Sequence, residues 1–288
     1  TAHIEAVRRF VAEEGVDLAS IDVVGFHGQT ITHKPLDGFT WQIGNGQALA
    51  RALGRPVVAD LRSADVAAGG QGAPLVPIFH QALARDLDLP VAVVNIGGVA
   101  NVTWVGGDGR LVAFDTGPGN APIDDWARRF TNQTFDVDGA LAARGEVFGE
   151  SVRAFLDSSY FLIFPPKSLD RNDFNVMLPT YLKVEDRIST LTYCTCLGIS
   201  IAQRHFPSPA RTWIVCGGGS FNDTIMRWLA QLVDGVVMTG AAYGWNVEAL
   251  EAQAFGFMAV RHLRGLPNSF PSTTGARHPV IGGVLHRP

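Results

Sequence analysis

The sequence lacks the features that mark several whole classes of protein. Its 288 residues include only three cysteines, which are too few for a disulfide framework and are typical of a reducing compartment. No apolar run reaches the roughly 18 residues that a membrane span needs, and the N-terminus lacks the basic-then-apolar pattern of a secretory signal. We therefore expect a cytoplasmic protein that has no contact with a membrane.

Basic residues are scarce as well. The chain has 23 Lys and Arg against 27 Asp and Glu, a net charge of −4, and no basic cluster offers the positive footprint that nucleic acid requires. We expect no nucleic-acid partner. Metal binding by thiols is also disfavoured, because Cys194 and Cys196 lie two apart in a segment of helical pattern and have no histidine at ligand spacing nearby.

The order of the expected elements indicates the fold class. A chain of 288 residues is long for one core, so two domains are expected, and the pattern changes at Leu89-Pro90. Strands and helices interleave, with one antiparallel meander after that point, which predicts an α/β architecture. Strands are expected at 21–26, 39–43, 56–60, 91–96, 100–105, 111–115, 212–215 and 236–239. Helices are expected at the N-terminus and at 47–53, 76–85, 141–157, 185–205 and 247–263, and His33-Lys34 is interpreted as a solvated loop.

The segment 112–120, VAFDTGPGN, is the most informative stretch. A strand is expected to end on Asp115, and a Gly-Pro-Gly turn leads into a helix that Asn120 can cap and whose first turn holds Pro122 and Asp124. A carboxylate beside glycine amides and a helix N-terminus is suited to chemistry on an anion, most commonly phosphate. The alternative is an aspartate that only caps a turn.

Glycine is abundant, at 32 residues, and three glycine-rich turns each follow a strand, at 95–98, 117–119 and 217–219. Ligands of open α/β sheets bind beyond the carboxyl ends of the strands, so these turns can converge on one crevice. None has the phosphate-loop lysine or the dinucleotide fingerprint, which argues against a dinucleotide-dependent oxidoreductase. Asp115 is then the candidate general base for a hydroxyl or water that attacks phosphorus.

A second polar set lies at or just after strand ends in the first part of the chain, where a sugar could be recognised. For each member the alternative is a side chain that caps a turn. The set comprises His27, Gln29, Gln42, Asn45, Asp60, Arg62 and Asp65. Glu251, on the last long helix, is either a site residue or part of a polar helix face, and Lys167 is interpreted as a loop lysine.

Seven segments, in collinear order from about Ile21 to the C-terminus, resemble the anhydro-N-acetylmuramic acid kinase family. They are 27–30 (HGQT), 42–45 (QIGN), 59–77, 95–98 (NIGG), 114–120 (FDTGPGN), 165–168 (PPKS) and 216–219 (CGGG). The resemblance implies the sugar kinase, Hsp70 and actin superfamily, with two RNase H-like domains and ATP between them. Residues 1–90, with 265–288 packing back on them, would form the sugar side, and residues 91–264 the nucleotide side.

The same resemblance implies an activity. The enzyme would use ATP and Mg²⁺ to open the 1,6-anhydro ring of anhydro-N-acetylmuramic acid with water and to phosphorylate O6. The product would be N-acetylmuramic acid 6-phosphate, in bacterial peptidoglycan recycling. The partner is therefore a small molecule, and the family also implies a homodimer.

Roles carry over to individual residues by their motifs. Asp115 would activate the ring-opening water. The cofactor-binding residues would be Asn95, Gly97 and Gly98 in the second phosphate hairpin, Gly117 and Gly119 in the next turn, and Gly217, Gly218 and Gly219 against the adenosine. The sugar-binding residues would be His27, Gln42, Arg62, Asp65, Asn120 and Glu251. No metal ligand is assigned.

One departure from the family pattern is serious. The family begins with Gly-x-Met-Ser-Gly-Thr-Ser-x-Asp-Gly-x-Asp, the first phosphate hairpin, whereas this sequence opens in the helix that should follow the first meander. We expect the first domain to be incomplete because an N-terminal part is missing from the sequence. The alternative is a non-catalytic sugar-binding or regulatory homologue that has lost ATP turnover.

Overall fold

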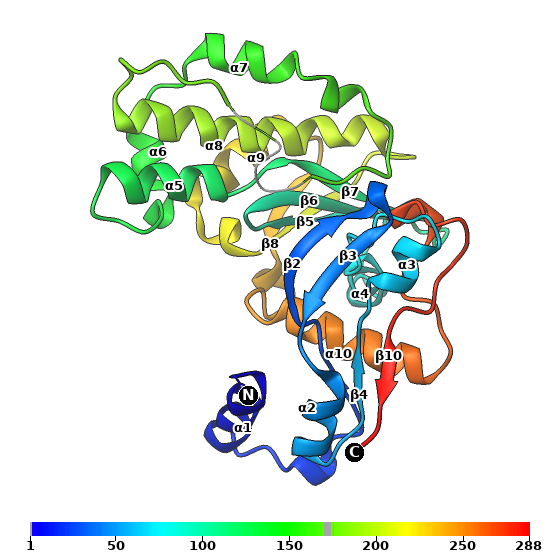
Figure 1. The fold of residues 1–288 in the computed structure, drawn as a ribbon. Helices are drawn as coiled ribbons and strands as arrows, with labels where there is room; N and C mark the ends of the chain where they lie inside the picture. Colours follow the sequence, from blue (N-terminus) through cyan, green and yellow to red (C-terminus); the bar gives the residue numbers. More distant parts are fainter. Residues whose placement is uncertain (1, 170–173, 175) are drawn as a thin grey trace. The chain divides into compact units, whose positions relative to one another are not determined.

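The computed structural model describes residues 2–169, 174 and 176–288, and the chain divides into two compact units. Unit 1 comprises Thr1–Phe79 and Ala249–Pro288, and unit 2 comprises His80–Glu248 (Figure 1). The division differs from the predicted boundaries at 90 and 264. Helix α10 (Leu250–Leu263) groups with unit 1 because it packs against strands β1 (Val24–Gly25) and β4 (Val57–Ala59) of that unit.

Unit 2 is built on a five-stranded mixed sheet of order β7-β6-β5-β8-β9. Strands β5, β6 and β7 form an antiparallel meander, and β8 and β9 continue from β5 in parallel. This order is that of an RNase H-like sheet, so the α/β fold class is confirmed. The strands are β5 (Val91–Ile96), β6 (Val99–Val105), β7 (Leu111–Pro118), β8 (Thr212–Cys216) and β9 (Val236–Thr239).

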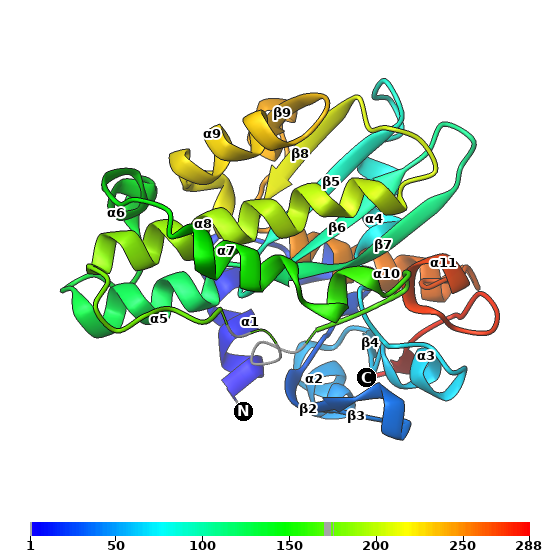
Figure 2. The same ribbon diagram turned by 90° about the horizontal axis from the view of Figure 1, so that it is seen from above.

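Helices bury this sheet and explain its apolar sequence. Figure 2 shows α8 (Val184–Ile201) and α9 (Asp223–Leu232) along one face, where their side chains join those of Val94, Trp104 and Phe114 in one core. Helices α5 (Ala121–Phe130), α6 (Ala140–Arg144) and α7 (Gly149–Leu156) form a second core with the other side of α8. Helix α8 is therefore buried on most of its surface, as its apolar and small residues require.

Unit 1 has a smaller sheet and a separate hairpin. Strand β1 (Val24–Gly25) pairs in parallel with β4 (Val57–Ala59), which pairs antiparallel with β10 (Val284–His286). Strands β2 (Gln29–Lys34) and β3 (Phe39–Ile43) form the hairpin. The helices are α1 (Ala2–Glu13), α2 (Gly46–Leu53), α3 (Ser63–Ala67), α10 and α11 (Pro271–Thr274), and α4 (Pro77–Leu83) spans the boundary between the units.

Several elements differ from the sequence prediction. His33 and Lys34 belong to strand β2 rather than to a loop, and β10 was not foreseen. The helix predicted over 141–157 is two helices, α6 and α7, because the chain passes so close to α8 at Gly145 that a Cβ there would overlap the carbonyl oxygen of Glu185. Strand β7 continues to Pro118, three residues beyond the predicted end at Asp115.

The predicted core cysteines are confirmed. Cys194 and Cys196 are buried in helix α8, and burial raises the pKa of the Cys194 thiol to about 12. Among the described residues, no group of three or more His, Cys, Asp or Glu side chains is arranged to hold a metal ion. No helix in the same part of the chain is long and apolar enough to cross a membrane.

Candidate active site

The three predicted glycine turns meet at one end of the unit 2 sheet. Backbone hydrogen bonds join the first two turns: Gly119 N–H donates to the Gly98 carbonyl at 3.0 Å and Asn120 N–H to the Gly97 carbonyl at 2.6 Å. The third turn follows β8, whose Cys216 pairs with Asn95 of β5. We call these turns, 97–98, 117–119 and 217–219, the glycine cradle.

Glycine is required where the turns touch. Gly217 has φ +71°, and a Cβ there would lie 2.6 Å from Asn95 Oδ1, while a Cβ on Gly119 would overlap the carbonyl oxygen of Gly97. At Gly97 and Gly98, by contrast, an added Cβ would meet no other atom closer than 3.6 Å. The turns therefore pack on one another through bare backbone and leave room beside Gly97 and Gly98.

Asn120 links the cradle to helix α5, but not as the predicted cap. It occupies the N-cap position of α5 with no side-chain cap hydrogen bond. Its Nδ2 instead donates to the Ile96 carbonyl at 3.1 Å. The helix N-terminus, with Asp124 in its first turn, thus begins directly beside the cradle, and its partial positive charge favours an anion there.

Asp115 lies inside strand β7, before a β-bulge. It pairs in register with Asn101 of β6, and the register shifts between Ala100 and Asn101 so that Thr116 is an extra residue. Asn101 pairs in turn with Asn95 of β5. Cross-strand partners project from the same face of a sheet, so the three side chains form a row from the candidate base to the first residue of the hairpin at 95–98. Sequence reasoning missed Asn101, because register alone reveals it.

Three hydrogen-bonding groups of Asp115 contact one segment of unit 2, Tyr160–Leu169, which we call the clasp segment. The Tyr160 hydroxyl donates to the Asp115 carbonyl at 2.5 Å, and the Asp115 N–H donates to the Lys167 carbonyl at 3.1 Å. The Leu169 N–H donates to Asp115 Oδ2 at 2.7 Å. The side chain that sequence motifs single out is thus held by a segment about 50 residues further along the chain.

Lys167 lies in a loop, as interpreted from the sequence, but it is buried. Its residue is 6% exposed, and Nζ donates to the Tyr160 carbonyl at 3.0 Å. The ammonium also lies 4.4 Å from the centroid of the Tyr160 ring and 5.5 Å from that of Phe114. Burial lowers the pKa of Lys167 to about 8. Nothing in the local sequence could reveal that Lys167 is buried. Phe114 is distant in the chain, and the contact with Tyr160 depends on tertiary packing.

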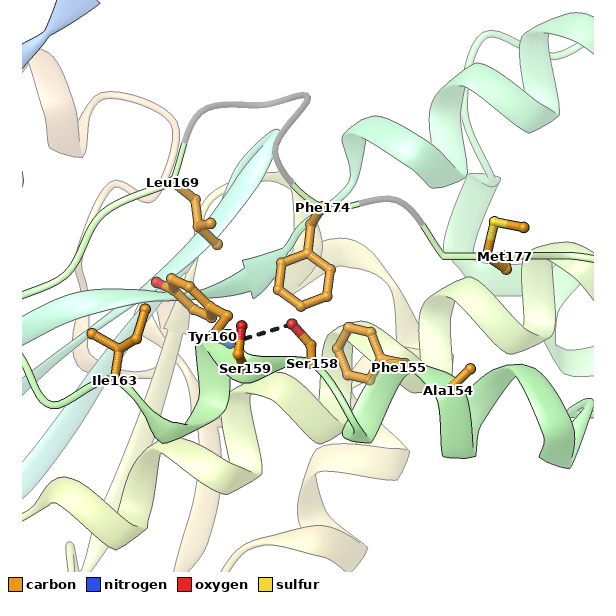
Figure 3. Close-up of a pocket in the computed structure, with 9 residues that line it drawn as sticks. All are labelled: Ala154, Phe155, Ser158, Ser159, Tyr160, Ile163, Leu169, Phe174 and Met177. Carbon is orange, nitrogen blue, oxygen red and sulfur yellow. Dashed lines mark hydrogen bonds between the residues drawn. The ribbon is translucent and has the colours of Figure 1, made fainter.

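Tyr160 and Leu169 also line a pocket of about 490 Å³ in unit 2. Figure 3 shows aromatic rings around it and hydroxyl groups on its floor, where the Tyr160 N–H donates to Ser158 Oγ at 3.3 Å. The pocket was not foreseen from the sequence. Its lining residues are Ala154, Phe155, Ser158, Ser159, Tyr160, Ile163, Leu169, Phe174 and Met177.

In unit 1 the structure brings together His27, Arg62 and Glu251. Arg62 Nε and Nη2 lie 3.0 and 2.9 Å from His27 Nε2, and a guanidinium only donates, so the ring proton is on Nδ1 and donates to the Gly28 carbonyl at 2.8 Å. Burial, and then the charge of Arg62, hold the pKa of His27 below its usual value, while Glu251 acts in the opposite direction. Arg62 Nη1 also donates to the Gly72 carbonyl at 2.6 Å.

Other predicted sugar-side residues lie on the β2–β3 hairpin and at turns. Gln42 Nε2 donates to Thr40 Oγ1 at 2.8 Å and contacts Thr30 Oγ1 at 3.4 Å on the polar face of the hairpin. Asn45 and Asp60 cap turns, which confirms the alternative interpretation for these two. Asn45 Oδ1 accepts from the N–H of Ala48, and Asp60 Oδ1 from that of Ser63.

Asp65 is wholly buried and its carboxylate has protein partners. It accepts hydrogen bonds from the Gly72 N–H and the Thr274 hydroxyl, both at 2.7 Å, and from the Ser269 hydroxyl. These bonds tie the loop at 69–72 to the C-terminal segment. They give Asp65 a structural role, and its predicted contact with a sugar stays a prediction.

Comparison with known protein families gives one match over the full chain. The family model described as anhydro-N-acetylmuramic acid kinase matches residues 1–288. A protein of Rhizorhabdus wittichii with that name is 52% identical over 287 residues, covering 99% of this chain and 79% of the relative. One of Paramagnetospirillum magneticum with the same name is 51% identical over 289 residues, covering 99% of this chain and 81% of the relative.

Solved structures show only a distant similarity. The activator of 2-hydroxyisocaproyl-CoA dehydratase from Clostridium difficile, with bound ADPNP, aligns with a TM-score of 0.41 and 13% identity, covering 73% of this chain and 68% of that one. The xylulose kinase from Rhodospirillum rubrum aligns with a TM-score of 0.39 and 14% identity, covering 69% and 45%. Scores this low carry no argument about function.

Proposed function

Because the chain belongs to the anhydro-N-acetylmuramic acid kinase family, we propose that it uses ATP to convert 1,6-anhydro-N-acetylmuramic acid into N-acetylmuramic acid 6-phosphate. A water oxygen adds to C1 of the sugar, the C1–O6 bond breaks, and O6 takes the γ-phosphate, which leaves ADP. The reaction belongs to peptidoglycan recycling in the cytoplasm. The single observation that carries the proposal is the placement of Asp115 and the glycine cradle on one sheet.

The cradle has the chemistry to hold ATP phosphates. An added Cβ would make only ordinary contacts at Gly97 and Gly98, no closer than 3.6 Å, and helix α5 begins beside these glycines. Backbone amides and a helix N-terminus stabilise phosphate oxygens. ATP supplies the transferred phosphoryl group, and we propose Gly217, Gly218 and Gly219 for the adenosine side. Mg²⁺ enters with ATP to neutralise phosphate charge.

Asp115 is proposed as the base that takes a proton from the attacking water. Its carboxylate is half-buried and oriented by the Leu169 N–H, and in register it stands two strands from Asn95 in the hairpin. A carboxylate that is fixed in orientation near the phosphate site can accept the proton as the water oxygen bonds to carbon. General-base action of this kind contributes about 10²- to 10⁴-fold to the rate.

All of the proposed sugar contacts except Asn120, which belongs to unit 2, come from unit 1. His27, Arg62 and Glu251 are adjacent there, and Gln42 lies on the polar face of the hairpin. A charged Arg62 whose orientation is fixed by His27 can donate hydrogen bonds to hydroxyl and carboxylate groups of a sugar. Asn120 and Asp65 complete the proposed set, Asp65 through the loop that it holds. A homodimer is part of the same proposal.

The test is ADP release by the purified full chain with and without the anhydro sugar. The parent should release ADP only when the sugar is present. Asp115→Asn should lower kcat by about 10²- to 10⁴-fold while calorimetric binding of the sugar persists. The matched control is Asp157→Asn, an exposed aspartate of the same unit, which should behave as the parent.

Two outcomes would contradict the proposal. Turnover of Asp115→Asn within a few-fold of the parent would remove Asp115 from the role of base. Sugar binding by the parent with no ADP release would favour the non-catalytic homologue instead.

A further inference from the structure

The clasp segment closes the outer edge of strand β7 at one point. β7 is the first strand in the sheet order, so its second edge has no strand partner among the described residues. At Asp115 the backbone groups pair instead with the clasp segment: the N–H with the Lys167 carbonyl and the carbonyl with the Tyr160 hydroxyl. The carboxylate receives the Leu169 N–H. One segment thus fixes both the backbone and the side chain of the candidate base.

Lys167 connects the two ends of the clasp segment. Its carbonyl accepts the Asp115 N–H, while its ammonium binds the Tyr160 carbonyl and lies over the Tyr160 ring. The ring that Lys167 holds is the one whose hydroxyl reaches Asp115. Burying Lys167 to 6% exposure costs desolvation energy. The buried ammonium holds Tyr160, and the Tyr160 hydroxyl bonds to the backbone of Asp115.

We propose that Tyr160 and Lys167 are positioning residues for Asp115, holding its carboxylate in the orientation that removes a proton from the attacking water. The inference rests on the proposed function of Asp115 as a base. Neither residue touches the reacting atoms. Tyr160 acts through the Asp115 carbonyl, and Lys167 acts through Tyr160 and through the backbone that leads to Leu169.

The physical argument is one of alignment. A catalytic group must be held to within a fraction of an ångström, and a displacement of about 1 Å costs up to about 10²-fold in rate. Asp115 directly precedes the bulge at Thr116, where the ladder to β6 is locally disrupted. The clasp segment supplies from the opposite edge the restraint that the ladder does not give at this position.

The variants separate the hydroxyl from the charge. Tyr160→Phe keeps the ring under Lys167 and removes the hydroxyl that donates to the Asp115 carbonyl. Lys167→Met removes the charge at similar length, and Lys167→Arg keeps it. The controls are Tyr181→Phe and Lys183→Met, two exposed residues of the same unit. All are compared in the full chain by ADP release, with thermal unfolding to verify the fold.

We expect Tyr160→Phe to lower kcat by about tenfold and Lys167→Met by up to about 10²-fold. The KM for ATP should stay unchanged in both, because the glycine cradle is untouched. Lys167→Arg should retain most of the activity, and both controls should match the parent. If Tyr160 and Lys167 had a purely structural role, their variants would lower the stability of the protein and would not lower kcat while leaving the KM for ATP unchanged.

The dependence of kcat on pH gives a second readout. Burial lowers the pKa of Lys167 to about 8, so the parent should lose kcat as the pH rises through about 8 and the ammonium loses its proton. Among the described residues, Lys167 Nζ donates to the Tyr160 carbonyl, the Lys167 carbonyl accepts the Asp115 N–H, and the Lys167 charge acts on His205, on which Arg204 acts as well. Neither Arg nor Met titrates in this range, so both variants should lack the alkaline limb.

Three results would overturn the inference. One is a parent-like kcat in Tyr160→Phe and Lys167→Met. Another is an unchanged limb near pH 8 in Lys167→Arg. The third is a rise in the KM for ATP that accounts for the whole defect. If Asp115→Asn abolishes turnover while Tyr160→Phe and Lys167→Met do not affect it, only the positioning role is contradicted. If Asp115→Asn remains active, the proposed role of Asp115 as the base is contradicted.

Discussion

Two glycine-rich regions of this molecule use the same residue for opposite purposes. In unit 1 the loop at 69–72 closes around a carboxylate of the chain itself: Gly72 N–H donates to Asp65, and a Cβ on Gly70 would overlap Asp65 Oδ2. In unit 2 the glycine cradle leaves room at Gly97 and Gly98, where an added Cβ would meet no other atom closer than 3.6 Å. Glycine thus lets the chain close around its own carboxylate in unit 1, and in unit 2 it leaves room where we propose that ATP phosphates bind.

The largest effect should come from removing the internal anion. Asp65→Ala leaves the Gly72 N–H and the hydroxyls of Ser269 and Thr274 without their acceptor in a wholly buried site. Because hydrogen bonds to charged groups contribute about 1.5–3 kcal/mol each, we expect the free energy of unfolding to fall by about 3 kcal/mol or more. Urea unfolding measures this, with the exposed Asp37→Ala as control. A loss below about 1 kcal/mol would show that the loop does not depend on its carboxylate.

A smaller effect should follow from filling the cradle. In Gly98→Ala the new Cβ would lie 3.6 Å from the Cβ of Ala121, an ordinary contact, so stability should hardly change. The methyl group would occupy the space proposed for phosphate, and we expect ATP affinity to fall by about tenfold, or about 1.4 kcal/mol. Isothermal titration measures it. Gly149→Ala, whose Cβ would meet nothing closer than 3.8 Å, is the control, and equal ATP affinity in the two variants would argue against the cradle as the phosphate site.

The smallest effect should be a pH response that is confined to the unit 1 loop. The pKa of His27 lies below 6.5 in the folded state, so the unfolded state binds the proton first as the pH falls. Stability is then fully present above about 6.5 and is lost as the pH falls through the lowered pKa. Protonated His27 would repel Arg62, which holds the Gly72 carbonyl.

This response is measured by urea unfolding at pH 7.5 and 5.0. The drop in the unfolding midpoint between these values should be smaller in His27→Gln than in the parent, while the exposed His278→Gln should match the parent. An identical drop in His27→Gln would remove His27 as the source.

The sequence was informative where local chemistry determines the structure. The buried valine run of β5 could only be a strand, and the glycine turns at strand ends did converge. Residues whose surroundings come from distant segments could not be predicted. Lys167 had no local mark of burial, and the protein partners of Asp65 were not predicted because its three donors lie in the loop at 69–72 and in the C-terminal segment.

The alternation of polar and apolar residues was a weaker guide to the strands of unit 1. Strand β2 went unrecognised because its inner side chains are polar, whereas the outer face of the hairpin exposes Phe39, Trp41 and Ile43. This is the reverse of the usual pattern of a half-buried strand. The polar inner face is also where Gln42 and His33 meet Thr40, so the missed strand belongs to the proposed sugar side.

The single extra residue at Thr116 sets the phase of strand β7. The pairing of β7 with β6 from Leu111 onward places Asp115 opposite Asn101, so the two side chains project from the same face of the sheet. If the pairing at Gly117 continued backward without a bulge, Asp115 would stand opposite Val102. Its side chain would then project on the face of Ala100 and Val102, which α8 and α9 bury. Straightening the bulge with Thr116 retained would therefore turn the carboxylate into the apolar core, whereas deleting Thr116 would leave Asp115 opposite Asn101 in a continuous ladder.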